Sequence, residues 1–332
     1  PMDPARHAEL VAARRAAAAD APPALLDPGS HRVPRRSTAF AAQLLEEARA
    51  RRLTGGEILL LFEEAALHDV AAVAHHLRLE RTDPDVVTYV VDRNVTYTNL
   101  CYADCQFCAF NRHQGDGDEY LLDSATILAK CRSVVDAGGT QILLQGGHHP
   151  KLKIEYYEEL FRRLKGSFPD LWLHALSPPE IVHIVKGSRL TLPETLRRLR
   201  GAGLDSIPGG GAEILVDRVR RKLARNKCSS QEWLDVMEEA HRQGLRSTAT
   251  MMFGHVETLA ERIEHLVRLR EVQDRSGGFT AFICWTYQSP NTNLERKVPS
   301  MAGGHEYLKT LAVSRLMLDN FPHVQGSWVT QG

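Results

Sequence analysis

Residues 99–110, NLCYADCQFCAF, place Cys101, Cys105 and Cys108 in a C-x3-C-x2-C pattern. Structural zinc sites are usually closed by four ligands, and bacterial ferredoxin runs follow a C-x2-C-x2-C spacing with a further cysteine. No fourth cysteine follows here at a matching interval. The stretch therefore predicts a metal site that is held by three thiolates and leaves one position open to another ligand.

The other three cysteines are not expected to supply a fourth ligand. Cys131 falls on the inner face of a predicted helix, Cys228 just before a helix cap, and Cys284 within a predicted strand. We interpret them as small buried hydrophobic residues. Six cysteines in 332 residues are too sparse for a disulfide framework, so metal binding in a reducing compartment is expected.

Composition excludes several classes of partner. Lys plus Arg equals Asp plus Glu at 41 each, so no long-range field attracts nucleic acid or an anionic membrane. No apolar run reaches the roughly 18 residues that a membrane span needs. The first residues lack the pattern of a secretory signal. We therefore expect a cytoplasmic protein without a nucleic-acid or membrane partner.

The chain divides into three parts by composition and hydrophobic pattern. Residues 1–36 are rich in Ala, Arg and Pro, which predicts a poorly ordered extension, and their acidic residues disfavour a transit peptide. Residues 37–84 form an N-terminal helical segment, with helical periodicity over residues 40–79. Thr54 and Glu57 have the spacing of a capping box, which marks the start of a helix.

Strands and helices alternate over residues 85–332. Strands are expected over residues 86–91 with 94–99, then 140–145, 171–176, 204–208, 246–253, 279–285 and 324–329. Helices are expected from Ser124, over 156–165, from about Leu192, and over 229–241, 259–273 and 305–320. Such alternation implies a parallel sheet with right-handed crossovers. About seven short apolar strands predict an α/β fold of the (β/α) TIM-barrel type, closed or nearly closed.

Active-site residues of such barrels lie at the carboxyl ends of the strands. There the sequence has Gly146-Gly147 and, further on, the run PGGGAE at residues 208–213. Gly210 and Gly211 let a backbone approach a ligand closely, while the Glu213 carboxylate points into the same space. The alternative is a tight turn, with Glu213 in the first turn of a helix.

Histidines supply candidates for proton transfer. His174 lies in a predicted strand and His255 just after one, so both are expected at the barrel mouth. The adjacent pair His148-His149 is not expected to bind a metal, because neighbouring side chains diverge and no partner set accompanies them. His265 is expected on a helix surface.

The cysteine pattern, with Phe107 just before the last cysteine, resembles that of the radical SAM superfamily. The resemblance implies a [4Fe-4S] cluster on the three cysteines, with one iron open to S-adenosylmethionine. It also implies that the backbone of Gly146 and Gly147 accepts the methionyl amino group, and that Phe107 contacts the adenine. Gly210 and Gly211 are further candidate contacts of this cofactor or of the substrate.

Longer blocks resemble one branch of the superfamily, the cyclic dehypoxanthine futalosine synthases. They are residues 92–110, 138–150, 174–181, 203–220, 248–258, 277–285 and 311–332. His148 replaces a residue that is more often apolar in this branch, and Cys284 replaces one that is more often proline. The branch continues into a further strand, so the resemblance predicts a barrel that lacks its last strand in this chain.

The resemblance implies a menaquinone-pathway enzyme that cyclises dehypoxanthine futalosine. A 5′-deoxyadenosyl radical would take hydrogen from ribose C4′, and the carbon radical would attack the benzoate ring. Glu213, His174 and His255 are the candidate bases for the final proton loss. A flavodoxin or ferredoxin is the implied electron donor. The alternatives are aminofutalosine synthase, a deazaflavin-cofactor synthase, and a non-enzymatic iron–sulfur carrier or zinc module.

Overall fold

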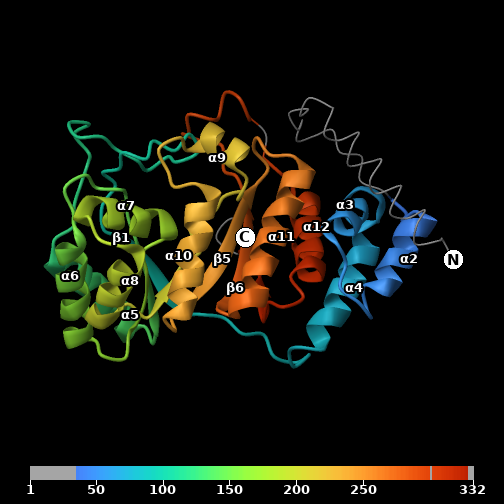
Figure 1. Ribbon diagram of the computed structural model, residues 1–332, viewed down its shortest axis with the longest axis horizontal. Coiled ribbons are helices and arrows are strands. Elements are labelled where there is room, and N and C mark those ends of the chain that lie inside the picture. Colours follow the sequence, from blue (N-terminus) through green and yellow to red (C-terminus); the bar gives the residue numbers. More distant parts are fainter. Residues whose placement is uncertain (1–34, 300, 328–332) are drawn as a thin grey trace.

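Seven parallel strands follow one another in chain order across a single curved sheet (Figure 1). The computed structural model describes residues 35–299 and 301–327. Among these residues no pairing joins β7 to β1, so the sheet forms a partial (β/α) barrel. The strands are β1 (Asp92–Thr96), β2 (Gln141–Gln145), β3 (Trp172–Ala175), β4 (Ser206–Ile207), β5 (Arg246–Phe253), β6 (Phe279–Thr286) and β7 (His323–Gln325). The predicted fold class and number of strands are confirmed.

Helices connect the strands and lie around the sheet (Figure 1). They are α5 (Ser124–Asp136), α6 (Ile154–Ser167), α7 (Pro178–Ser188), α8 (Leu192–Ala202), α9 (Asp217–Leu223), α10 (Ser230–Arg242), α11 (Leu259–Ser276) and α12 (Gly304–Met317). The sequence pattern anticipated most of them, but it missed α7 and α9. Helix α5 has Asp123 as its N-cap, and the Asp123 side chain accepts the Thr126 N–H. The cap predicted at Ser124 is therefore displaced by one residue.

Three helices precede the sheet: α2 (Ala39–Glu47), α3 (Gly55–Glu64) and α4 (Leu67–Leu79). Thr54 and Glu57 form the predicted capping box at the start of α3. Ile58 and Leu61 are fully buried. Helices α3 and α4 pack against α11 and α12, and Figure 1 shows them at one end of the molecule. The N-terminal helices therefore share one continuous hydrophobic core with the barrel.

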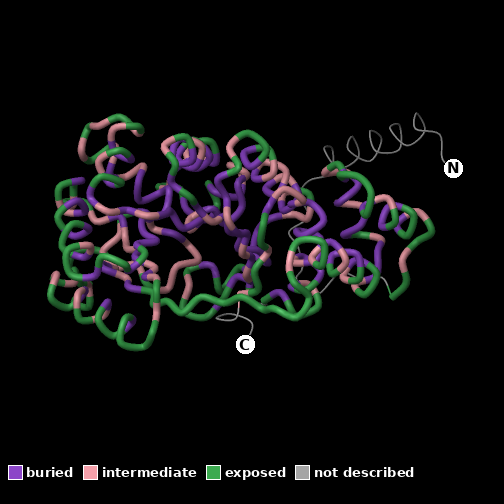
Figure 2. The backbone as a smooth tube through the Cα atoms, turned by 90° about the horizontal axis from the view of Figure 1, so that it is seen from below, coloured by how far each residue is buried: buried purple, intermediate pink, exposed green. Residues whose placement is uncertain are grey.

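The predicted strand at residues 86–91, VVTYVV, is wrong. This segment lies outside the sheet apart from one hydrogen bond, from the Thr140 N–H to the Val91 carbonyl at 3.3 Å, and Val87 and Tyr89 are 84% and 86% exposed. It belongs to an exposed connection between α4 and β1 (Figure 2). The preference of Val and Tyr for strands reflects packing on a half-buried sheet, and here no neighbouring strand supplies that surface.

Three expectations concern the ends and the membrane. The proposed extension at residues 1–36 lies almost wholly outside the described residues, as does the end of the strand predicted at 324–329. In the described part of the chain no helix is long and apolar enough to cross a membrane.

All the strands run in the same direction, so their carboxyl ends meet at one edge of the sheet. This edge gathers the cysteine loop after β1, the glycines after β2, the start of α7 after β3, and the loops after β4 and β5.

Candidate active site

The loop after β1 carries the three clustered cysteines. Cys105 is buried, while Cys101 and Cys108 are half-buried, and all three are free thiols. The Cys108 N–H donates to the Cys105 carbonyl at 3.1 Å, and the Cys101 N–H donates to the Arg112 carbonyl at 2.9 Å. Backbone hydrogen bonds thus fix the turn that presents the thiols.

Burial makes two of these thiols, those of Cys101 and Cys105, hard to ionise. It raises the pKa of Cys105 to about 12, although the nearby Lys227 cation opposes the shift. Burial also raises the pKa of Cys101, whose sulfur accepts the His148 N–H at 3.2 Å. A bound cation is therefore needed to hold them as thiolates.

Across the described residues, no three His, Cys, Asp or Glu side chains lie close enough together to hold a single metal ion.

Gln106 anchors the cysteine loop from two sides. Its N–H donates to the Leu223 carbonyl at the end of α9 at 2.7 Å. Its carbonyl accepts the N–H of Leu294, in the loop after β6, at 2.9 Å. The cysteines are thus tied to elements that lie far along the chain.

Gly146 and Gly147 let the end of β2 approach this loop closely. A Cβ on Gly147 would lie 2.4 Å from the Leu100 carbonyl oxygen and 2.8 Å from the Cys101 Cβ. A Cβ on Gly146 would lie 2.6 Å from the Tyr97 ring. Neither position has room for a side chain, so chain packing alone requires glycine at both.

The Gly146 carbonyl does not take part in the hydrogen-bond ladder of the sheet. The Leu176 N–H donates to the Leu144 carbonyl at 3.0 Å, and the next rung would need an N–H on residue 178. That residue is Pro178, which has no N–H. Among the described residues the Gly146 carbonyl has no hydrogen-bond partner. It is an acceptor that a ligand at the strand ends could use.

Glu180 is a buried residue of the site that the sequence analysis did not identify. Its Oε1 accepts the Tyr97 hydroxyl and the Gly146 N–H, each at 2.9 Å. Its Oε2 accepts the Ser177 N–H at 2.8 Å and the Ser177 hydroxyl at 2.6 Å. Burial raises the pKa of Glu180, against the effect of these donors. One carboxylate thus ties together the ends of β1, β2 and β3, and the capping-box spacing of Ser177 and Glu180 was the available signal.

The glycine run after β4 is also enclosed by protein. A Cβ on Gly210 would lie 2.4 Å from Gln145 Nε2. Gly211 has a φ of +74°, and its Cβ would lie 2.4 Å from Pro179 Cγ. Backbone conformation and packing therefore account for Gly211, whereas Gly210 meets the flexible end of the Gln145 side chain, which can move. Ligand contact at both glycines remains a prediction.

Glu213 lies at the centre of a buried charge cluster. The helix that follows begins only at Asp217, so the alternative that placed Glu213 in a first helical turn is wrong. Its Oε1 accepts a hydrogen bond from Lys227 Nζ at 3.0 Å, and its Oε2 lies 3.6 Å from Arg220 Nη1. Lys227 Nζ also lies 5.2 Å from the centre of the Phe107 ring. Lys227, which sequence reasoning did not single out, thus links Glu213 to the cysteine loop.

His174 is buried between neighbouring strands. Its Nδ1 lies 2.7 Å from the Ser206 hydroxyl on β4, and its Nε2 lies 3.5 Å from the Thr248 hydroxyl on β5. Burial lowers the pKa of His174 to about 4. The ring is therefore neutral near pH 7, with Nε2 only loosely held.

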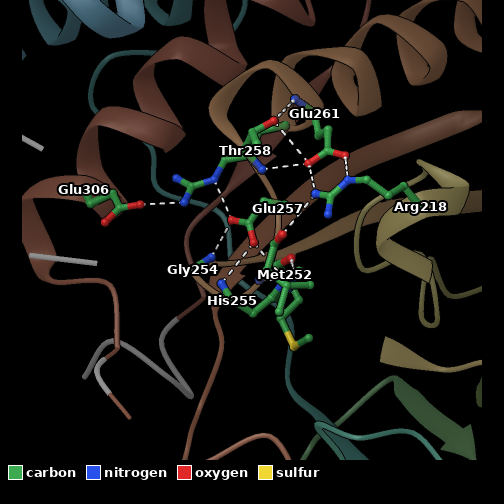
Figure 3. A network of polar contacts seen from close by, with 10 residues as sticks. Arg218, Met252, Gly254, His255, Glu257, Thr258, Glu261 and Glu306 are labelled. Atoms are coloured by element: carbon green, nitrogen blue, oxygen red, sulfur yellow. Dashed lines mark hydrogen bonds and ion pairs between the residues drawn. The ribbon is translucent and has the colours of Figure 1, made fainter. Parts of the chain in front are cut away.

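His255 is engaged at both ring nitrogens. Its Nε2 lies 2.9 Å from the Met252 carbonyl, and its Nδ1 lies 2.7 Å from Glu257 Oε2. Glu257 also accepts the Gly254 and His255 N–H groups and pairs with Arg262 at 2.8 Å (Figure 3). These contacts hold the loop after β5, and they leave His255 no ring nitrogen for a substrate.

Two further histidines, His265 and His148, are buried. His265 is fully buried, and its Nδ1 accepts the Leu215 N–H at 3.0 Å, so its predicted place on a helix surface is wrong. The His148 ring stacks on His183 with centroids 5.4 Å apart, and the hydroxyl of Tyr102 lies 3.2 Å from His183 Nδ1. His148 Nδ1 is buried without a hydrogen-bond partner in the described part of the chain.

Comparison with protein-family models gives two matches. Residues 95–269, more than half of the chain, match the model described as the Radical SAM superfamily. Residues 276–332 match the model described as the CofH/MqnC C-terminal region.

Two curated relatives and one solved structure carry the comparison further. The chain is 45% identical over 284 residues to cyclic dehypoxanthine futalosine synthase of Streptomyces coelicolor, covering 85% of this chain and 71% of that relative. It is 41% identical over 282 residues to aminodeoxyfutalosine synthase of Thermus thermophilus, covering 84% of this chain and 76% of that relative. The hydrogenase maturase HydG aligns with a TM-score of 0.69 at 14% identity, over 87% of this chain and 63% of that one. This last likeness concerns the fold alone.

Proposed function

The chain belongs to the radical SAM superfamily, and we propose that it cyclises dehypoxanthine futalosine to cyclic dehypoxanthine futalosine in menaquinone biosynthesis. The observation that carries the proposal is the 45% identity to an enzyme of that name over 85% of the chain. The aligned region is long enough to include the cysteine loop and most of the strand ends. The chain is thus a SAM-dependent enzyme, and its substrate is a small molecule.

The donor set fits an iron–sulfur cluster. Three thiols lie on one short loop, the Cys101 sulfur already accepts an N–H, and the buried Lys227 cation is close to Cys105. N–H···S hydrogen bonds and nearby positive charge both stabilise thiolate ligands. We propose that Cys101, Cys105 and Cys108 hold a [4Fe-4S] cluster, which a flavodoxin or ferredoxin reduces.

The neighbouring residues supply contacts for S-adenosylmethionine. The Gly146 carbonyl is available to accept the methionyl amino group, and the adjacent Gly147 keeps the loop close. We propose that Phe107 offers a ring face for the adenine and that the backbone at Gly210 and Gly211 contacts the same cofactor or the substrate. When bound, the cluster and S-adenosylmethionine supply the radical that removes hydrogen from ribose C4′, so that this carbon can add to the benzoate ring of the same molecule.

The chain's own task is to position the substrate, exclude water and accept a proton. A reactive radical demands a substrate held in near-attack geometry. Glu213 and His174 are the proposed proton acceptors, because Glu213 is a carboxylate and His174 is a neutral imidazole with a loosely held Nε2. The engaged nitrogens of His255 support a positioning role for that residue instead.

Aminodeoxyfutalosine synthesis is the second candidate, because the chain is also 41% identical to such an enzyme. The residues LLQGG (143–147) and HALSPPEI (174–181) favour the cyclase. A carrier protein would bind a cluster but would not cleave S-adenosylmethionine.

Anaerobic reconstitution with iron, sulfide, a reductant, S-adenosylmethionine and dehypoxanthine futalosine tests the proposal. We expect 5′-deoxyadenosine and the cyclised product to form together. The Cys105→Ala variant is expected to form neither, while Cys131→Ala, a buried cysteine of α5, retains both. An intact cluster that yields neither compound in the wild-type protein would refute the proposal.

A further inference from the structure

Exposed cations surround the cysteine loop. Gln106, in the middle of this loop, contacts Leu223 at the end of α9 and Leu294 in the loop after β6. The three segments therefore meet at the carboxyl edge of the sheet (Figure 1). Both leucines are buried, but exposed cationic side chains lie close to them in the sequence. These cations, which together form the basic rim, are Arg221, Lys222, Arg225, Arg296 and Lys297.

The positive charge of the basic rim is not balanced locally. In the described part of the chain, no ion pair or hydrogen bond engages any of its five side chains. Residues 99–110, 221–227 and 291–298 contain six cations in all, and their acidic residues are Asp104 and Glu295. The whole chain, in contrast, has a formal net charge of zero. This edge of the sheet therefore attracts an acidic partner.

The acidic side chains further along the loop after β1 have partners of their own. Asp118 pairs with Arg112 at 2.7 Å, and Asp116 accepts the His113 N–H at 2.6 Å. Glu119 accepts two backbone N–H groups. Their charge is thus met within this part of the loop.

Two exposed aromatic side chains flank the cysteines. Phe110 is 76% exposed, two residues after Cys108. Tyr102, directly after Cys101, is 40% exposed. The Tyr102 carbonyl accepts a hydrogen bond at 3.2 Å from Asn226, which adjoins the basic rim in the sequence. Exposed aromatic residues are typical of surfaces that bind another protein.

The cysteine loop is also the place where an electron has to enter. Cys101 and Cys108 are half-buried, so the proposed cluster lies close to the surface at this loop. Electron transfer between two centres weakens steeply with the distance between them. A protein that donates the electron therefore has to dock beside this loop.

We propose that the basic rim, together with Tyr102 and Phe110, is the docking surface for a flavodoxin-type electron carrier. The inference rests on the proposed function, which requires an electron from outside. An acidic carrier complements the charge of the basic rim, and the aromatic side chains suit a flavodoxin because its flavin presents an apolar ring edge. In the transfer the reduced flavin loses one electron and the oxidised cluster gains it, while no bond forms between the two proteins.

Two charge-reversal variants test this surface. Lys222→Glu with Arg225→Glu alters the basic rim. Arg35→Glu with Arg36→Glu makes the same change in net charge at two exposed cations just before α2, which Figure 1 shows at one end of the molecule and away from α9. Stopped-flow spectroscopy measures how fast each anaerobically reconstituted variant oxidises reduced flavodoxin, with S-adenosylmethionine present and dehypoxanthine futalosine absent.

We expect the rim variant to oxidise flavodoxin about 10- to 100-fold more slowly than the wild type at low salt. The difference should shrink at about 0.5 M salt, where surface charges are screened. The control variant at Arg35 and Arg36 should react like the wild type. Dithionite, which needs no docking surface, should reduce the cluster of every variant equally fast at the higher salt.

Phe110→Ser tests the apolar part of the surface. We expect it to slow the oxidation of flavodoxin at least about fivefold at both salt concentrations, because salt does not screen an apolar contact. Ferredoxin lacks the flavin ring edge. A ferredoxin that reacts faster than flavodoxin with the wild type would overturn the choice of carrier.

Equal flavodoxin rates in the rim variant and in the Arg35 and Arg36 control would overturn the inference. A rim variant that keeps its flavodoxin rate but binds dehypoxanthine futalosine more weakly, or changes its oligomeric state, would overturn it as well. If the rim variant takes up no cluster, the wild type decides, because a flavodoxin rate that does not fall with added salt contradicts the docking surface. Since dehypoxanthine futalosine is absent, failure of the proposed cyclisation is distinguishable from failure of this inference.

Discussion

The Gly146 N–H donates a 2.9 Å hydrogen bond to Oε1 of Glu180. This bond fixes the peptide that follows β2, and the carbonyl of the same residue has no ladder partner among the described residues because Pro178 has no N–H. Because Glu180 also holds Tyr97 and Ser177, a single buried side chain sets the relative positions of three strand ends.

Replacing Glu180 should therefore destabilise both the fold and the site. Glu180→Ala leaves the hydroxyl and N–H donors without an acceptor, so we expect a loss of at least about 3 kcal/mol in the free energy of unfolding. Tyr97→Phe removes a single donor and should cost only about 1 kcal/mol. Urea denaturation measures both, and equal losses in the two variants would contradict the role given to Glu180.

Gly147 should be needed for loading the cluster. In Gly147→Ala the new methyl group meets the Leu100 carbonyl oxygen, so the cysteine loop must move, at a cost of about 1–3 kcal/mol in stability. We expect a lower iron content after reconstitution. Gly166→Ala is the matched control, because that helical site is open. Alanine there should raise the free energy of unfolding by about 0.5–1 kcal/mol. Full iron loading of Gly147→Ala would show that the loop tolerates the shift.

His148→Leu should leave the protein as stable or make it more stable, by up to about 2 kcal/mol, because it removes a buried nitrogen that lacks a partner. The control is His241→Leu, since the His241 nitrogens lie 2.7 Å from the Ser276 hydroxyl and 2.6 Å from the Ser247 hydroxyl. Its loss should reach about 2 kcal/mol. Thermal or urea unfolding compares the two variants, and a large loss in His148→Leu would reveal a partner for its nitrogen.

Acid should destabilise the metal-free protein well above the usual carboxylate range. Burial lowers the pKa of His174 and of His241 to about 4, and that of His265 to about 3. The usual pKa of histidine is about 6.5, so between about pH 6.5 and pH 4 the unfolded chain binds more protons than the folded one. The free energy of unfolding therefore decreases as the pH is lowered through this range. The three sites together remove up to about 4 kcal/mol per pH unit.

His241→Gln tests the sign and size of this effect. We expect its unfolding free energy to fall less steeply with acid than that of the wild type, by up to about 1.4 kcal/mol per pH unit. Urea titrations at several pH values give the slopes. A wild-type stability that stays level over this range would mean that these rings are protonated in the folded protein.

Local sequence was enough to predict most of the fold. Apolar runs bounded by glycine marked the strands, and the capping box at Thr54 marked a helix start. Residues 86–91 had the composition of a strand but lacked a neighbour to pair with, and pairing is not written in a segment's own composition.

The candidate site was only partly visible in the sequence. The spacing of three cysteines within one loop is enough to predict a metal site. Glu180 and Lys227, in contrast, act through contacts with residues far along the chain. Glu180 reaches Tyr97, and Lys227 reaches Phe107. His265 looked like a surface residue because its helix is polar overall, yet its ring faces the core.

The most direct test of the proposed function measures the transfer of the ribose C4′ hydrogen to 5′-deoxyadenosine. Dehypoxanthine futalosine deuterated at ribose C4′ is incubated anaerobically with the reconstituted protein and S-adenosylmethionine, and the 5′-deoxyadenosine is analysed by mass spectrometry. We expect one deuterium in the 5′-deoxyadenosine, formed together with the cyclised product. Unlabelled 5′-deoxyadenosine alongside cyclised product would contradict it.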